Sequence, residues 1–261
     1  MNRIEVLAEL LDDACIQAMP IAPLSNLHAL TMDQAYGIQR ASIARRVARG
    51  ERIVGIKMGF TSEAKMRQMG VKDQISGWLT DAMHVNSGAS IALKKYIHPR
   101  CEPEIAFLLK RALPGDATEE QALDAIDAVA PAIEIIDSRY EQFKFSLTDV
   151  IADNASSAGF VVGAWTPCPA SLSGLNVSLL QDGVVRQSGS SSDILGNPIR
   201  SLVAAARLAA QAAMPLQAGW IVLAGAATAA NALMPGSDVH AVVERIGAVG
   251  FSVTSTNSNE H

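Results

Sequence analysis

The chain has 261 residues, of which 49% are hydrophobic, 18% charged and 5% aromatic. Lys and Arg total 21 and Asp and Glu total 26, which gives a formal net charge of −5. The apolar fraction excludes a disordered chain, and the small acidic excess excludes a general attraction to nucleic acid or to an anionic membrane. A chain of this length buries about 70% of its surface on folding, enough for one large core or for two unequal domains.

Cysteine usage and the apolar segments favour a soluble protein in a reducing cytoplasm. The three cysteines, Cys15, Cys101 and Cys168, are widely spaced and odd in number, so they predict neither a disulfide framework nor a thiolate zinc site. The acidic side chains near the start of the chain are not typical of a signal peptide. No apolar stretch of the sequence reaches the roughly 20 residues that a membrane span needs.

The first part of the chain has a helical pattern. Apolar residues recur at helical spacing from residue 4 to 11, and a capping box at Thr31 opens a second helix that ends at Gly50. Residues 52–58 then have the composition of a short strand. We therefore predict a smaller, mainly helical region over residues 1–80.

From about residue 80 the pattern changes to short strands. Thr118 opens a helix that is predicted to continue through Val129, and Asn197-Pro198 opens another. Asp182-Gly183 lies between two strand-like runs and predicts a hairpin. This pattern predicts an α+β fold, with a β-rich catalytic domain over residues 81–261. The predicted strands are 89–93, 105–109, 132–136, 160–164, 175–180, 221–223, 239–243 and 248–254.

Three glutamates carry the strongest chemical signal. Glu102 and Glu104 are two residues apart, so both carboxylates point to the same side of an extended strand that continues into apolar sequence. Glu134 is the single charge in the apolar run 132–136. Carboxylates near a core need a neutralising partner, and a divalent cation such as Mg²⁺ or Mn²⁺ suits oxygen ligands. The alternatives are a solvated strand edge for the pair and an ion pair with Arg139 for Glu134.

Other polar residues are candidates for the same site. Lys57 lies between two glycines in Gly55–Gly59, and a lysine near a metal and an anionic substrate can bind a carboxylate or move a proton. Asp81 is a candidate to orient that lysine. The polar run Asp153–Ser157 precedes an apolar strand, and its side chains can hold a substrate by hydrogen bonds. The simpler interpretations are an exposed lysine at a strand end, a loop aspartate and a local turn.

Four spaced motifs resemble one family. The sequence is similar to the hydratase/decarboxylase family of aromatic meta-cleavage pathways, within the fumarylacetoacetate hydrolase superfamily, from about residue 4 to 253. The motifs are Gly55-Ile-Lys-Met-Gly-Phe-Thr-Ser, Pro99-Arg-Cys-Glu-Pro-Glu-Ile-Ala-Phe, Pro131-Ala-Ile-Glu-Ile-Ile-Asp-Ser-Arg and Ala152-Asp-Asn-Ala-Ser. The resemblance implies a helical N-terminal region packed on a mixed-sheet barrel or roll core of the fumarylacetoacetate hydrolase C-terminal type.

The family has two close branches. The run that follows Lys57 and the run Ala224-Gly-Ala-Ala-Thr-Ala-Ala are similar to the 4-oxalocrotonate (2-oxo-3-hexenedioate) decarboxylases. The alternative branch is the 2-hydroxypenta-2,4-dienoate hydratases. Membership of the first branch implies metal-dependent loss of CO₂ from a small dicarboxylate 2-oxo acid, in complex with a partner hydratase, and the chain is also expected to form a homo-oligomer.

The resemblance also assigns roles to residues. It implies a Mg²⁺ or Mn²⁺ ion on the three glutamates, Lys57 as a catalytic residue, and Asp81 near it. Three carboxylates and a dianionic substrate exceed the charge of one divalent cation, which favours Lys57 as a further positive charge, with Arg139 as a second candidate. We expect Thr61, Arg139 and Ser156 to contact the substrate. A hydrolase of acylpyruvates would need a histidine base, and none of the five histidines lies in a matching motif.

Overall fold

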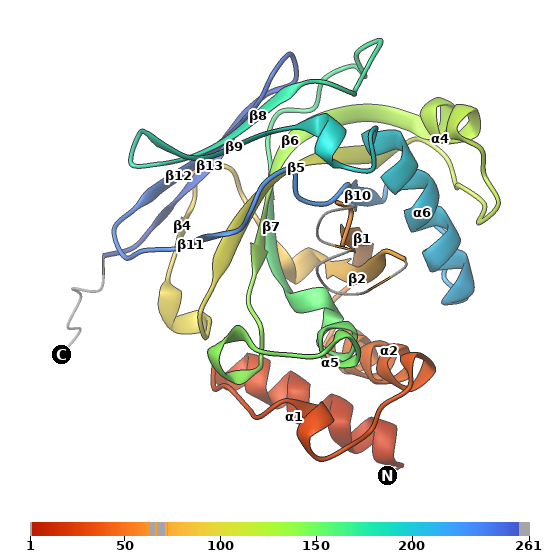
Figure 1. Cartoon of the computed structure of the whole chain (residues 1–261), viewed down its shortest axis with the longest axis vertical. Helices are drawn as coiled ribbons and strands as arrows, with labels where there is room; N and C mark the ends of the chain where they lie inside the picture. The colour runs from red at the N-terminus through yellow and green to blue at the C-terminus, as the bar shows by residue number, and fades with distance from the viewer. Residues whose placement is uncertain (1, 63–65, 67–70, 72, 256–261) are drawn as a thin grey trace.

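Two β-sheets and a layer of N-terminal helices make up the fold (Figure 1). The computed structural model describes residues 2–62, 66, 71 and 73–255. None of the described helices is long and apolar enough to cross a membrane.

The N-terminal layer consists of α1 (Arg3–Gln17) and α2 (Met32–Ala48), and α5 (Leu147–Ala152) packs beside α2 (Figure 1). The predicted capping box at Thr31 is present, since its side chain accepts from the backbone N–H three residues on. Apolar residues of α1, α2 and α5 share one buried cluster that includes Tyr140. Burial of this shared apolar face stabilises the layer more than helix propensity does.

A buried aspartate joins the two N-terminal helices. Asp12 Oδ2 accepts hydrogen bonds from Arg45 Nε at 2.8 Å and from Arg49 Nη1 at 2.6 Å, and Asp12 Oδ1 accepts from Arg49 Nη2 at 2.8 Å. Burial raises the pKa of Asp12, but the two guanidinium groups outweigh burial and lower the pKa below its usual value.

The larger sheet has eight strands and mixes parallel and antiparallel pairs. Its order is β2-β1-β10-β5-β6-β7-β3, and β11 pairs with β5. Because β1 and β2 pair within this sheet, the sheet includes strands from both sides of the predicted domain boundary after residue 80. The strands are β1 (Ile53–Gly59), β2 (Ile75–Thr80), β3 (His84–Val85), β5 (Arg100–Leu109), β6 (Ile126–Ile136), β7 (Ser157–Val162), β10 (Ile221–Leu223) and β11 (Asn231–Ala232).

The smaller sheet has five strands in the order β4-β13-β12-β8-β9. The predicted hairpin at Asp182-Gly183 joins β8 to β9, and both residues have the positive φ, 55° and 73°, that a tight hairpin turn requires. The strands are β4 (Ser90–Ile91), β8 (Asn176–Gln181), β9 (Val184–Ser190), β12 (Asp238–Val243) and β13 (Gly247–Val253).

The helix predicted to run through Val129 is shorter than expected. It forms α4 (Glu119–Ala125), and β6 begins directly at Ile126. Val129 pairs with Phe107 in the long β5–β6 ladder, so strand pairing with a distant segment overrides the local helical spacing. The helix predicted after Asn197 is present as α6 (Pro198–Gln211).

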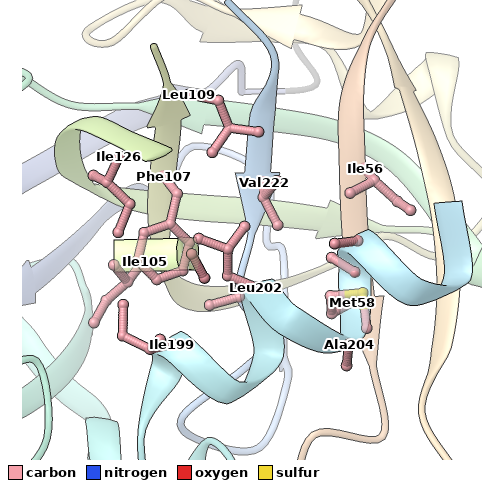
Figure 2. Close-up of a cluster of buried hydrophobic side chains, with 14 of the residues drawn as sticks. Ile56, Met58, Ile105, Phe107, Leu109, Ile126, Ile199, Leu202, Ala204 and Val222 are labelled. Atoms are coloured by element: carbon pink, nitrogen blue, oxygen red, sulfur yellow. The ribbon is translucent and has the colours of Figure 1, made fainter. Parts of the chain in front are cut away.

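Side-chain alternation along β5 separates the core from the candidate site. Ile105 and Phe107 face α6, where they pack with Leu202 and Val222 (Figure 2). Because successive side chains of a strand point to opposite faces, the even-numbered residues of β5, Glu104 among them, face the other way.

Candidate metal centre

Three glutamates meet on one face of the β5–β6 ladder. Glu102 and Glu134 are direct partners across the two strands, and Glu104 lies two residues along β5 on the same face. One carboxylate oxygen from each residue lies within 4.8 Å of the others. The antiparallel register therefore brings together the three carboxylates that were selected from the sequence.

The electrostatics of the cluster indicate a missing positive charge. Glu104 and Glu134 are 0% exposed. Burial raises the pKa of Glu104 well above its usual value, and the nearby charge of Glu134 adds to this rise. Burial also raises the pKa of Glu134, although Lys57 opposes the rise. Glu104 Oε1 and Glu134 Oε1 are buried without a hydrogen-bond partner among the described residues, so the donor set fits a divalent cation.

The backbone of Gly225 holds the carboxylate of Glu104, and Thr61 packs against Gly225. The backbone N–H of Gly225 donates to Glu104 Oε2 at 2.7 Å. Gly225 has φ +95°, and a Cβ at this position would lie 2.2 Å from Thr61 Oγ1, so only glycine fits. Thr61 is buried against this glycine, and its predicted contact with the substrate stays a prediction.

Lys57 lies inside the cluster and not at an exposed strand end. It is 3% exposed, and its Nζ lies 3.0 Å from Glu134 Oε2 and donates to the carbonyl oxygen of Ala155 at 3.0 Å. Burial alone would lower the pKa of Lys57, but the carboxylates of Glu134 and Glu104 outweigh burial and raise it. The surrounding carboxylates therefore favour the charged form of Lys57.

The polar run before β7 forms a tight turn next to Lys57. Asn154, Ala155 and Ser156 all have positive φ, between 51° and 58°. The hydroxyl group of Ser156 is buried and has no hydrogen-bond partner among the described residues. The turn thus combines the two interpretations made from the sequence, because it is a local turn that also presents polar groups beside the cluster.

Asp81 is not brought to Lys57. Its carboxylate accepts from the backbone N–H and from Nε of Arg52, both at 2.9 Å. Asp81 follows the end of β2 where Thr80 pairs with Ile53, whereas Lys57 pairs with Gly77 farther along the same ladder. The structure thus shows Asp81 bonded to Arg52, and its role in orienting the lysine stays a prediction.

Arg139 is also held away from the three glutamates. Its guanidinium forms a buried ion pair with Asp153 and donates to the backbone oxygens of Asp137 at 2.6 Å and Ser157 at 3.2 Å. Glu134 therefore pairs with Lys57 and not with Arg139, and the Arg139 side chain supports the backbone of the turn.

Two backbone contributions to the site were not predicted from side-chain types. They are the N–H of Gly225 and the carbonyl of Ala155. The signals that could have pointed to them are the glycine two residues after the end of β10 and the Asp-Asn-Ala-Ser run before β7.

Comparison with known proteins identifies the family. Residues 52–254 match the fumarylacetoacetate (FAA) hydrolase C-terminal family. The chain belongs to this family. Within the FAA hydrolase family it is 54% identical over 252 residues to a 4-oxalocrotonate decarboxylase from Pseudomonas sp., an alignment that covers 97% of this chain and 98% of that protein. It is 34% identical over 257 residues to a 2-hydroxyhexa-2,4-dienoate hydratase from Comamonas testosteroni, covering 96% and 97% of the two chains.

A solved structure shares the fold over nearly the whole chain. The 4-oxalocrotonate decarboxylase from Pseudomonas putida G7, complexed with magnesium and adipate, has a TM-score of 0.92 and 36% sequence identity. The superposition covers 97% of this chain and 98% of that one. The predicted α+β fold of the FAA hydrolase C-terminal type is confirmed.

Proposed function

We propose that the protein is a divalent-metal-dependent decarboxylase that converts 2-oxo-3-hexenedioate (4-oxalocrotonate) to 2-hydroxypenta-2,4-dienoate and CO₂. The observation that carries this proposal is the buried cluster of Glu102, Glu104 and Glu134 with Lys57 against it. This cluster lies in a chain 54% identical to a 4-oxalocrotonate decarboxylase. The magnesium and adipate bound to the P. putida G7 relative are a divalent cation and a six-carbon dicarboxylate, which match this chemistry.

Glu102, Glu104 and Glu134 would hold Mg²⁺ or Mn²⁺. When bound, the ion supplies Lewis-acid stabilisation of negative charge on the substrate oxygens. The three carboxylates come from two paired strands, β5 and β6, and the hydrogen bond from the Gly225 N–H keeps Glu104 in place. Thr61, which packs on Gly225, and Ser156, which follows the Ala155 carbonyl bonded to Lys57, are candidate contacts for the substrate.

Lys57 supplies the positive charge that the substrate requires. Its ammonium group has three donors, of which one faces Glu134 and one bonds the Ala155 carbonyl. The third donor is then directed to a substrate oxygen. A buried, fixed cation stabilises developing negative charge more than a solvated one, because it does not reorganise during the reaction.

The bond changes follow from the substrate. The C5–C6 bond breaks, its electron pair forms the C4=C5 double bond, and the electrons of C3=C4 move to C2=C3. The C2 oxygen becomes an enolate, C6 leaves as CO₂, and one proton completes the dienol product. Lys57 stabilises the enolate oxygen and can deliver this proton.

Release of CO₂ tests the proposal. The purified protein with Mg²⁺ should release CO₂ from 2-oxo-3-hexenedioate, EDTA should abolish the release, and added Mg²⁺ should restore it. No CO₂ release with metal present would contradict the proposal. Hydration of 2-hydroxypenta-2,4-dienoate is the second candidate function, because the 34% identical relative is a dienoate hydratase.

We also propose that the protein acts in the cytoplasm, where it associates with a hydratase that consumes its dienol product, and that it forms homo-oligomers. Direct transfer would limit loss of this reactive enol to solvent. Size-exclusion chromatography of the chain alone and mixed with such a hydratase tests both associations, which are contradicted by separate elution at monomeric masses.

A further inference from the structure

The turn formed by Asn154, Ala155 and Ser156 lies directly against Lys57. Its φ values of 51°, 51° and 58° place three consecutive non-glycine residues in the left-handed region. This conformation is unfavourable for such residues, so the surrounding contacts must hold it. The carbonyl of Ala155, at the centre of the turn, accepts a hydrogen bond from Lys57 Nζ at 3.0 Å. The unfavourable backbone conformation of the turn therefore places the Ala155 carbonyl in contact with Lys57.

The side chain of Asn154 fastens the turn to β2. Asn154 Oδ1 accepts from the backbone N–H of Trp78 at 2.7 Å, and Asn154 Nδ2 donates to the backbone oxygen of Trp78 at 2.9 Å. Gly77 permits this approach, because a Cβ there would lie 2.4 Å from the backbone oxygen of Asn154. Gly77 also pairs with Lys57 between β1 and β2. The two Asn154–Trp78 hydrogen bonds, which form the Trp78 clamp, and Lys57 therefore lie on the same pair of strands.

Arg139 supports the turn from its other side. Its guanidinium donates to the backbone oxygens of Asp153 and Ser157, which flank the turn at either end. Both ends and the side chain of Asn154 are thus fixed. The Ala155 carbonyl between them is held in one direction.

We propose that Asn154 is a positioning residue that acts through the Trp78 clamp and the Ala155 carbonyl to orient the ammonium group of Lys57. With Glu134 and Ala155 as two fixed acceptors, the third N–H of Lys57 points in one direction, toward the substrate. This inference rests on the proposed function, because it concerns the group that acts on the substrate. Misdirection of this donor by an ångström is expected to reduce turnover without preventing metal binding.

The variant Asn154→Gly removes the side-chain hydrogen bonds to Trp78 and leaves the backbone conformation of the turn accessible. Glycine adopts the left-handed conformation freely, so the substitution removes the amide without adding strain. We expect kcat to fall about 10- to 100-fold. We expect KM and the Mg²⁺ dissociation constant from calorimetry to change less than about threefold, since no ligand is altered. Thr118→Ala, which removes the N-cap of α4 on the surface, is the control for a moderate loss of stability.

If Asn154→Gly does not fold, Asn154→Asp replaces it. Aspartate keeps the acceptor for the Trp78 N–H but loses the donor to the Trp78 carbonyl, and kcat is expected to fall about 10-fold. A lower melting temperature with kcat within twofold of wild type would show that the clamp is only structural. A lower kcat together with a higher KM and weaker Mg²⁺ binding would also overturn the inference, because the turn would then shape the whole pocket.

The same assay keeps this inference distinct from the proposed function. The variant-to-wild-type ratio is measured on whichever reaction the wild type catalyses, CO₂ release or hydration of the dienoate. Absence of CO₂ release in the wild type contradicts the decarboxylase assignment, whereas a ratio near one contradicts the role of Asn154.

Discussion

Lys57 Nζ lies 3.0 Å from Glu134 Oε2, although the two residues are on strands separated by β10 and β5 in the sheet order. The contact places a buried cation against a buried carboxylate that also belongs to the group of three glutamates. One side chain can therefore balance the charge of the metal ligands and face the substrate.

Replacement of Lys57 should remove turnover and leave metal binding intact. Lys57→Met keeps the apolar stem but loses the charge, and kcat is expected to fall about 10²- to 10⁴-fold, the range for a positioned acid–base group. The Mg²⁺ affinity from calorimetry should be retained, because the three glutamates remain. Lys94→Met, an exposed substitution, is the matched control. Near-normal kcat in Lys57→Met would remove this residue from the chemistry.

Replacement of Glu104 should have opposite effects on metal binding and on the stability of the metal-free protein. Glu104→Gln keeps an acceptor for Gly225 but removes a buried charge that faces Glu134. Mg²⁺ affinity should fall by more than about 10- to 100-fold, the effect of altering even an outer-shell group. The melting temperature without metal should rise. Glu120→Gln on the surface should change neither quantity, and unchanged Mg²⁺ affinity in Glu104→Gln would contradict its role as a ligand.

Metal binding and metal-free stability should depend on pH in opposite directions. The folded-state pKa of Glu104 is raised, so its contribution to stability is present at low pH and is lost as pH rises through the folded value. Mg²⁺ competes with this proton, so the apparent affinity should rise with pH. Calorimetric titrations between about pH 6 and about pH 8 measure the affinity, and thermal melts of wild type and Glu104→Gln isolate the stability term. An affinity independent of pH would oppose this account.

The N-terminal layer should be sensitive to Asp12. Asp12→Asn loses charge-assisted bonds to Arg45 and Arg49, and solvent screening at the two guanidinium groups limits the cost to about 1–2 kcal/mol. The folded pKa of Asp12 is lowered, so its contribution is present above the usual aspartate value and lost as pH falls through the folded value. Urea unfolding at neutral and acidic pH measures this loss. Asp13→Asn, which removes a longer and more exposed contact with Arg45, should change stability little.

The sequence was sufficient where one side chain carries the signal. The Glu102 and Glu104 spacing and the isolated charge of Glu134 made these residues candidates, because an unpaired carboxylate in apolar sequence needs a partner, and the family resemblance implied that they form one ligand set. The roles of Asp81 and Arg139 could not be judged in this way, since both depend on which distant residue supplies the partner. Arg52 and Asp153 supply those partners in the folded chain.

Two further features could not be predicted from the sequence: the roles of backbone groups and the pairing of distant strands. Almost every residue has a backbone N–H and a carbonyl, so the sequence does not show which of them take part in a site. Only the fold shows that the Ala155 carbonyl bonds Lys57 and that the Gly225 N–H bonds Glu104. The helix expected through Val129 became strand because the long ladder with β5 outweighs local spacing. Long-range pairing is the information that a local pattern lacks.

The most direct test of the central claim is product analysis by proton NMR, with CO₂ release measured in parallel. The purified chain is supplied with 2-oxo-3-hexenedioate and Mg²⁺, and separately with 2-hydroxypenta-2,4-dienoate. The account predicts Mg²⁺-dependent formation of 2-hydroxypenta-2,4-dienoate and CO₂ from the first substrate, with no hydration of the second above background. Unchanged 2-oxo-3-hexenedioate, together with hydration of the dienoate to a 4-hydroxy-2-oxo acid, would contradict it.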